Sequence, residues 1–539
     1  MNKTSDHRAI RAIAGDYFDY MGRQFPTLCL SDEFYFFPRA KSALRSLATL
    51  ESLDKEKISQ NVKEIKRLRR SLAALKPEAL EDYTDLKLLE QSLATFLREF
   101  DDQLVWRTNP TLYLKMILLG VEHILVKAPY FAKDSLHAAL LSKLRGIPGL
   151  IKEAKENLKI IPAGYLEASL EMVDYATEYF WHLSFERSTP RRHKDLRRAT
   201  GRAILALNDL KSLLRRKRPA HYFLKEKSLL TRIIKDSLSL DLTPEDIFAI
   251  ASGELAKTKK ELRQAAKNLA TAARWQSIAG EYRLHASSGR ELLTLYEDQI
   301  AKILTFLKNG DLVTISPTPR ILVRPTPYYM LPVRASASYA CPISDDPKEP
   351  AFFYITPDSG IHNEYIFVSA HETFPGHHLL DAKRRSLNNP IRSQIESPLF
   401  YEGWASYAEQ LVGGLPHIRS HPAQKIIGLR RQAWRAVRAM LDSGIRTKEM
   451  SIAQAQKELI GLGYPPRLVA IMLRHYLLTP GYQLCYTIGK YELERLKKTY
   501  APTIGARTFH DLVLESGQIP FALLEKKLEA YRCQRAQSS

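Results

Sequence analysis

The spacing of apolar residues predicts long helices in the first part of the chain. Apolar side chains that recur every three or four residues share one face of a helix. One such face is formed by Ile58, Val62, Ile65, Leu68, Leu72 and Leu75. Pro77 should end that helix, because proline cannot continue it. The next helix is marked by Leu86, Leu89, Leu93 and Phe96. The segment TPED at 243–246 is typical of a helix start, since threonine caps and acidic side chains favour that end.

The pattern changes after Gly310. Ten prolines occur in residues 1–310 and nineteen in the remaining 229, so helices in the second part are interrupted more often. Four short segments rich in β-branched and aromatic residues predict strands. These are LVTI at 312–315, RILV at 320–323, SASY at 336–339 and AFFYI at 351–355. Helical spacing resumes near residue 363 and continues, with breaks, to the last residues.

Composition is ordinary for a globular protein, with 45% hydrophobic and 26% charged residues. Collagen-like and wholly disordered classes are therefore excluded. The net charge of +21 suits contact with polyanions or acidic substrates but does not bear on the fold. Basic clusters at 63–70, 191–198 and 215–227 could grip nucleic acid. No recognition motif accompanies them, so we expect solvated helix faces and no nucleic-acid partner.

The cysteines and the first residues favour a cytoplasmic location. Cys29, Cys341, Cys485 and Cys533 lie far apart and form no CxxC pair, which is typical of reduced thiols. The first twenty residues show neither an apolar core nor a small-residue cleavage site. No uncharged run reaches the roughly 18–20 residues needed to cross a bilayer, so we expect no membrane association.

The segment HETFPGHH, residues 371–378, is the most informative one. In ordinary HExxH zinc sites two histidines lie one helical turn apart, with a glutamate beside the metal. Here His377 comes two residues late, and six residues turn an ideal helix by about 240°. A break at Pro375-Gly376 would return His377 to the metal. His378 is the competitor, because seven residues restore the face, but the rise of about 10 Å is too long for one ion.

A third ligand is available on a later predicted helix. Glu402 stands in FYEGWASYAEQL, and two histidines with one glutamate and an open position form the ligand set of catalytic zinc. We therefore expect one zinc ion per chain held by His371, His377 and Glu402; cobalt or manganese could occupy the same site. Glu409, seven residues after Glu402, could support a ligand histidine or be a solvated side chain.

These two segments resemble a known family. HETFPGHH and SPLFYEGWASYAEQL are similar to the HExxPGH and EGWAxYAE signatures of the bacterial domain of unknown function 885. AFFYITP at 351–357 and TPGYQLCYTIGK at 479–490 also fit, so the resemblance is densest from about residue 320 to 495. It implies a zinc metallopeptidase with a helical fold similar to the angiotensin-converting-enzyme and thimet-oligopeptidase types.

Hydrolysis on zinc needs a base for the water and a donor for the oxyanion. Glu372 adjoins the first ligand and is the expected base. The alternative is that Glu372 is a structural residue that forms an ion pair. Tyr486 is the first choice of oxyanion donor, followed by His475 and Tyr476. Substrate-binding candidates are Arg474 and Tyr482.

Together these patterns predict a mainly α-helical metallohydrolase with a small β-sheet next to the metal-binding helix. We expect residues 1–310 to form one helical wall of a cleft. The catalytic region should cover 311–539, with a β element at 311–360 and metal-binding helices at 363–411. An edge strand within 336–355 could pair with an extended substrate.

The expected activity is zinc-dependent cleavage of peptide bonds. The alternatives are another amide or ester hydrolase on the same metal, a catalytically silent helical binding protein, and a basic nucleic-acid binder.

Overall fold

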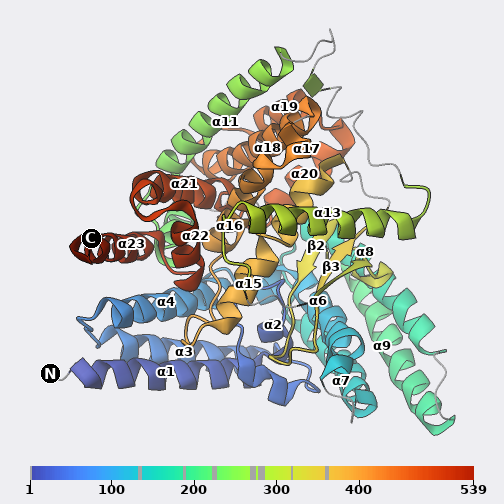
Figure 1. Cartoon of the computed structure of the whole chain (residues 1–539). Coiled ribbons are helices and arrows are strands. Elements are labelled where there is room, and N and C mark those ends of the chain that lie inside the picture. The colour runs from blue at the N-terminus through green and yellow to red at the C-terminus, as the bar shows by residue number, and fades with distance from the viewer. Residues whose placement is uncertain are drawn as a thin grey trace. The chain divides into compact units, whose positions relative to one another are not determined.

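The computed structural model shows a mainly α-helical chain with one small sheet, as predicted (Figure 1). It describes residues 3–131, 136–185, 190–220, 227–267, 275–276, 286–316, 320–334, 336–357, 363–419 and 421–538. The chain divides into two compact units, and two short segments of the later chain belong to the first unit. The first unit is Met1–Tyr222, Thr326–Ala335 and Ala340–Ala351; the second is Phe223–Pro325, Ser336–Tyr339 and Phe352–Ser539. Residues 223–310, which sequence pattern grouped with the preceding helices, thus belong to the second unit.

Helices account for nearly all regular structure in the first unit. The predicted apolar face lies on α3 (Lys55–Ala73) from Ile58 to Leu72, with Leu75 just beyond the helix, and the Asp54 carboxylate caps its N-terminus. The longer helices are α1 (Lys3–Gln24), α3 (Lys55–Ala73), α4 (Leu80–Leu97), α6 (Pro110–Glu122), α7 (Leu136–Asn157), α8 (Ala163–Leu183) and α9 (Pro190–Arg216). Shorter helical turns are α2 (Pro26–Leu30), η1 (Lys41–Ser46), η2 (Arg98–Asp102), α5 (Val105–Thr108), η3 (His123–Lys127), η4 (Ala128–Tyr130) and η6 (Tyr328–Met330).

The second unit begins with helices and contains most of the sheet. Thr243 and Asp246 cap α11 reciprocally, as TPED predicted: each side chain accepts a hydrogen bond from the other residue's backbone N–H. The helices before the sheet are α10 (Lys227–Arg232), η5 (Ile233–Ser237), α11 (Pro244–Lys267) and α13 (Gly289–Asn309). Those after it are α14 (Tyr365–Glu372), α15 (His377–Ser386), α16 (Pro398–Leu411), η8 (Val412–Gly414), α17 (Pro416–Arg419), α18 (Pro422–Thr447), α19 (Ile452–Gly461), α20 (Pro466–Tyr476), α21 (Cys485–Ile504), α22 (Ala506–Glu515) and α23 (Phe521–Ser538).

Three of the four predicted strands form a sheet with the order β1-β3-β2. The strands are β1 (Ile321–Pro325), β2 (Ala337–Ala340) and β3 (Ala351–Ile355). Every residue of the central strand β3 is buried, whereas β2 is an edge strand. The predicted strand at 312–315 is wrong. Thr314 donates its backbone N–H to the Asp511 carboxylate and Leu312 accepts from His510, so side chains satisfy this backbone in place of a neighbouring strand.

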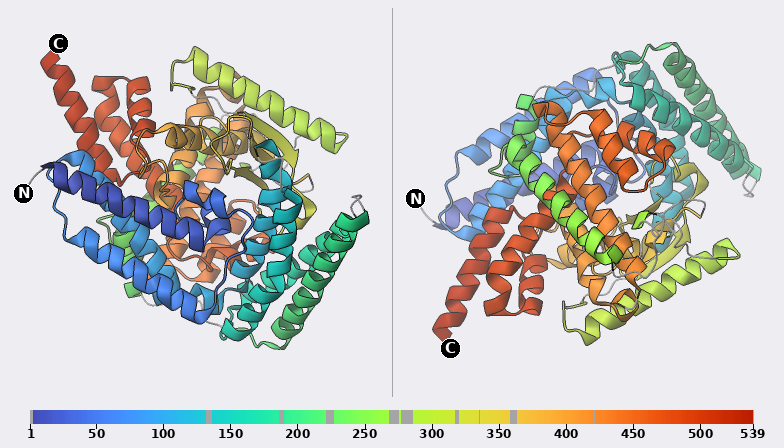
Figure 2. Two further views of the ribbon diagram at one scale, coloured as in Figure 1. Left: turned by 90° about the horizontal axis from the view of Figure 1, so that it is seen from below. Right: turned by 90° about the horizontal axis from the view of Figure 1, so that it is seen from above.

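Two glycines let α16 and α21 approach closely in the second unit. A Cβ atom on Gly403 would lie 2.5 Å from the Cα of Gly489, and one on Gly489 would lie 2.2 Å from the Leu399 carbonyl oxygen. Only glycine fits at such a contact. This crossing carries Glu402 toward the start of α21. Two further views (Figure 2) show α11 beside α18, with which it packs.

No helix within the described ranges combines the length and apolar character needed to cross a membrane.

Candidate metal centre

The predicted break in the metal-binding helix occurs between α14 and α15. Glu372 is the last residue of α14 and His377 the first of α15. The link closes tightly at Gly376, where a Cβ atom would lie 1.9 Å from the carbonyl oxygen of His371. Trp404 of α16 fixes the link by donating from Nε1 to the Pro375 carbonyl at 2.7 Å. The break therefore brings His377 beside His371 although six residues separate them; their ring centres are 4.7 Å apart.

His371, His377 and Glu402 form a buried cluster that could hold a metal ion. The Oε2 atom of Glu402 lies 3.4 Å from Nε2 of His371 and 3.6 Å from Nε2 of His377. Ligand atoms at about 2.0–2.1 Å from a tetrahedral zinc ion would be about 3.4 Å apart, so these separations fit such an ion. Glu402 Oε2 is buried and has no hydrogen-bond partner among the described residues. A metal ion, or a proton on one of the facing histidine nitrogens, would satisfy this oxygen.

The other carboxylate oxygen of Glu402 is held by two tyrosines. The hydroxyls of Tyr482 and Tyr486 donate to Oε1 at 2.5 and 2.7 Å. This leaves Oε2 directed at the two histidines. Burial by itself would raise the pKa of Glu402, but the histidine rings hold it well below its ordinary value. The side chain is thus an anion suited to a metal ligand.

An outer carboxylate orients the first histidine. Glu409 Oε1 lies 3.1 Å from Nδ1 of His371, so a proton on Nδ1 leaves Nε2 free to bind a metal. Arg431 and Arg435 of α18 both bind Glu409, at 2.8 and 2.6 Å. Although burial opposes ionisation, these arginines hold the pKa of Glu409 well below its usual range. Arg431 also pairs with Glu364, which extends the network away from the cluster.

Glu372 lies next to the ligand cluster and is half-buried. The backbone N–H of Tyr339, in edge strand β2, donates to its Oε2 atom at 2.8 Å. Burial raises the pKa of Glu372 to about 7; the Glu402 charge adds to this effect, while His377 and the Tyr339 N–H oppose it. The carboxyl group therefore changes protonation near neutral pH, as a general base requires.

Other predicted site residues lie apart from the three-residue cluster. The His378 ring packs against Tyr339 and Phe374, with ring centres 5.6 and 4.9 Å away. The metal-binding cluster found among the described residues does not include it. Arg474 and His475 are exposed near the end of α20.

Tyr476, the third candidate donor, ends α20 and accepts a hydrogen bond at 2.8 Å from Nε1 of Trp434. Its hydroxyl is thus joined to α18 through an indole.

Sequence reasoning missed two neighbours of the cluster. Tyr401 stacks on the His377 ring at 3.8 Å, and the α18 arginines hold the outer carboxylates. Arginines at 431, 435 and 438 follow helical spacing on a buried, largely apolar helix, and that pattern could have revealed them.

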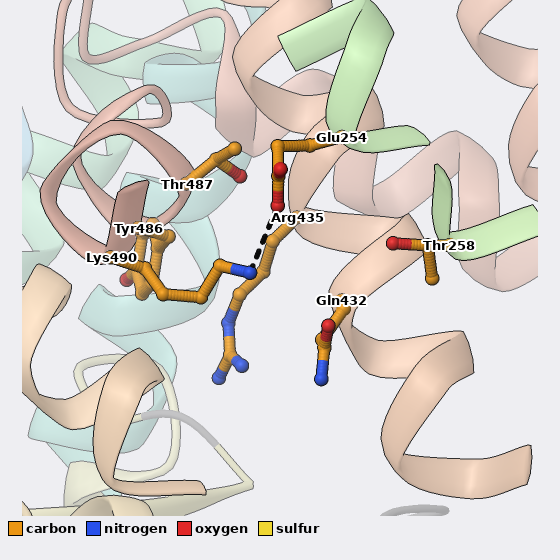
Figure 3. A pocket seen from close by; sticks show the side chains of 7 residues that line it. All are labelled: Glu254, Thr258, Gln432, Arg435, Tyr486, Thr487 and Lys490. Carbon is orange, nitrogen blue, oxygen red and sulfur yellow. Dashed lines mark hydrogen bonds and ion pairs between the residues drawn. The ribbon is translucent and has the colours of Figure 1, made fainter. Parts of the chain in front are cut away.

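A small hollow lies beside the cluster, between α11, α18 and α21 (Figure 3). Lys490 and Glu254 form an ion pair of 3.0 Å on one side of it. Arg435 and Tyr486 line it as well, so it adjoins the residues that support His371 and Glu402. The remaining lining residues are Thr258, Gln432 and Thr487.

Comparison with known proteins places the chain in a family. The family described as bacterial protein of unknown function, DUF885, matches residues 40–528. The chain belongs to this family. No curated protein matches it. Among solved structures, a candidate lipoprotein from Colwellia psychrerythraea is 16% identical with a TM-score of 0.75 and covers 98% of this chain and 99% of its own.

Two further structures are similar. A candidate lipoprotein of unknown function from Shewanella oneidensis is 16% identical, with a TM-score of 0.74 and coverage of 96% of this chain and 99% of its own. A carboxypeptidase from Pyrococcus furiosus, described as Apo-Mg, is 12% identical, with a TM-score of 0.42 and coverage of 97% and 99%. The first two likenesses show that the DUF885 chain shares their fold.

The expected cytoplasmic location is wrong, because two structural neighbours are described as candidate lipoproteins. The cysteine argument failed for a physical reason. Cys29, Cys341 and Cys485 are buried and form no disulfide, and a buried thiol without a second thiol in bonding geometry stays reduced in an oxidising compartment as well.

Proposed function

We propose that this DUF885 protein is a metal-dependent hydrolase that cleaves peptide bonds with water. The observation that carries the proposal is the convergence of His371 Nε2, His377 Nε2 and Glu402 Oε2 beside Glu372. With both imidazoles neutral and protonated on Nδ1, two nitrogen lone pairs and one carboxylate oxygen would face the same point, and a cation bound there would satisfy all three. Two histidines and one carboxylate favour zinc, at one ion per chain.

Glu372 is the proposed general base. When bound, the metal would polarise the substrate carbonyl and acidify a water molecule. Glu372 would accept the proton of that water and return it to the leaving amine. Its pKa of about 7 suits both transfers near neutral pH.

Edge strand β2 is the proposed binding edge for the substrate backbone. It lies at one side of the sheet and places the Tyr339 N–H against Glu372, so an extended peptide added to this edge would pass the base. A peptide is therefore the partner we propose, and nucleic acid is not.

Tyr482 and Tyr486 are proposed to position Glu402. Sequence reasoning assigned them to the substrate and the oxyanion, but both hydroxyl protons go to Glu402 Oε1. A tyrosine hydroxyl that donates its hydrogen bond to the Glu402 carboxylate has no second hydrogen to donate to an oxyanion.

The experiment that tests the proposal combines metal analysis with digestion of a peptide library, with and without a chelator. We expect one zinc per chain and cleavage that stops on chelation and returns with zinc. Adjacent histidines provide a matched pair: His377→Ala should lose the metal, whereas His378→Phe should keep it, because His378 packs between aromatic rings. Zinc retained by His377→Ala, or cleavage indifferent to the chelator, would overturn the proposal.

A further inference from the structure

Arg438 of α18 is a buried cation without a carboxylate partner among the described residues. Its side chain is 6% exposed. We propose that Arg438 binds the free α-carboxylate of a peptide substrate and so directs cleavage to bonds near a C-terminus. This inference rests on the proposed function and names its substrate class.

The neighbouring arginines of α18 show what Arg438 lacks. Arg435 and Arg431, one and two helical turns earlier, both pair with Glu409. Arg438 donates from Nε and Nη2 to the amide oxygen of Gln483, at 2.9 and 2.6 Å, and also contacts the Tyr486 hydroxyl, so both acceptors are neutral. Buried charges in proteins are usually paired. An unpaired guanidinium beside a candidate catalytic centre therefore indicates an anion that arrives with the substrate.

The surroundings of Arg438 hold its guanidinium rigidly. The ring centres of Trp434, Tyr476 and Tyr486 lie 4.6, 4.7 and 4.0 Å from its central carbon. Aromatic rings favour a cation at their faces but supply no anion. They leave the N–H groups in the guanidinium plane as the donors, and no carboxylate of the described residues forms an ion pair with them. A planar fork of this kind suits a carboxylate.

The Gln483 side chain, which accepts the hydrogen bonds of Arg438, is itself held in place. Its amide nitrogen donates to Oγ1 of Thr479 at 3.2 Å, which turns Oε1 toward Arg438. Its backbone N–H donates to Asp442 at 3.0 Å, which ties the loop to α18. The site is thus built before any ligand arrives, and binding need not reorganise it.

The position of Arg438 in the fold indicates how far from the cleaved bond it would bind a substrate. The ring of Tyr486 lies under the guanidinium, and its hydroxyl binds the ligand carboxylate of Glu402. One tyrosine side chain therefore separates Arg438 from the metal ligands. That span is about two extended residues at roughly 3.3–3.6 Å each, so the bound α-carboxylate belongs to the last one or two residues after the cleaved bond.

The test compares two peptides of one sequence, with a free carboxylate or an amide at the C-terminus. We expect wild-type protein to prefer the free acid by roughly 10- to 100-fold in kcat/KM, mainly through a lower KM. This is the usual contribution of hydrogen bonds to a charged group. Arg438→Gln should abolish this preference, because kcat/KM for the free acid should fall to the level of the amidated peptide. Arg438→Lys should restore part of it. Lys425→Gln removes an exposed charge from the same helix and should keep the preference.

Binding separates failure of this inference from failure of the proposed function. Calorimetry with Glu372→Gln protein should show the free acid binding more tightly than the amide, and the double variant with Arg438→Gln should bind both equally. This result would stand even if no chelator-sensitive cleavage were found. The inference would be overturned if the two peptides bound equally, or if Arg438→Gln lowered kcat/KM equally for both. It would also be overturned if the exposed Arg474→Gln variant, and not Arg438→Gln, lost the preference for the free acid.

Discussion

Two buried groups of charged residues, one in each unit, face very different neighbours. In the first unit Arg334 is fully buried among three carboxylates, 3.1 Å from Glu122, 3.6 Å from Asp32 and 3.8 Å from Glu33. Nearby, Lys127 donates to the Cys341 carbonyl at 2.7 Å. In this Arg334 group each ion-pair distance joins a cation to an anion, so the charges of the group offset one another.

In the second unit two histidines face one carboxylate. The Nε2 atoms of His371 and His377 lie near Glu402 Oε2, and with the proton of each ring on Nδ1 both nitrogen lone pairs would point to the place where a metal ion could lie. The difference teaches how to distinguish a structural charge group from a candidate metal site: burial and proximity are common to both, whereas only the Arg334 group has a permanently charged cation at its centre among the described residues. Variants that remove charge from either group should therefore affect different properties.

The largest effect is expected for Glu372→Gln in the second unit. The amide cannot accept a proton from water, so turnover should fall by about 10⁴-fold, equivalent to about 5.5 kcal/mol. Zinc content and Tm should stay near wild type, because Glu372 is not among the three clustered ligand residues. Peptide turnover and metal analysis on one preparation check this. Parallel loss of metal and activity would show that Glu372 is a ligand or a structural residue.

Arg334→Met should have the next largest effect, on stability alone. It removes the cation that faces Glu122 and Asp32, while Glu33 keeps its ion pair with Lys115, and breaking a buried ion pair destabilises a protein by about 3–5 kcal/mol. Urea unfolding measures this loss. Arg45→Met is the control, since the Arg45 and Asp19 side chains are 81% and 58% exposed and their pairing contributes little. Zinc stoichiometry of the folded Arg334→Met protein should stay at one; a loss of zinc would mean that the two groups do not differ as described.

The amino-acid sequence predicted those features that depend on residues close to one another along the chain. The α3 face, the cap of α11 and the break at Pro375-Gly376 each involve a few consecutive residues, and the structure has them as expected. The strand at 312–315 failed, because Asp511 and His510, about 200 residues later, satisfy its backbone.

The roles of Tyr482 and Tyr486 depend on distant residues in the same way. Their contact with Glu402 follows from the close crossing of α16 and α21 at Gly403 and Gly489, which no local pattern displays. Local spacing therefore predicted the three residues that cluster, while the residues that support them depended on tertiary structure.

Glu409→Gln should weaken zinc binding by about 10- to 100-fold, the usual cost of losing an outer carboxylate on a ligand histidine. Competition with a chromophoric chelator measures the Kd. Glu364→Gln is a sharp control: Glu364 shares Arg431 with Glu409 but binds away from His371. It should reduce stability and leave the zinc Kd within about twofold. If both variants weaken zinc equally, the effect comes from Arg431 and not from the orientation of His371.

The smallest effects are expected at Tyr482 and Tyr486, and they decide between the two roles of Tyr486. If each hydroxyl only holds Glu402 Oε1, Tyr482→Phe and Tyr486→Phe should each weaken zinc binding by about 1 kcal/mol, or roughly fivefold, because one donor remains. The double variant should lose more than the sum, since Oε1 is then left without either tyrosine donor. An oxyanion donor behaves differently: Tyr486→Phe would lower kcat by about 10²–10³-fold at saturating zinc and leave the zinc Kd unchanged. We expect the first pattern, because the Tyr486 hydroxyl already donates a hydrogen bond to Oε1 of Glu402 at 2.7 Å. Measuring kcat and zinc Kd on the same three variants separates the two.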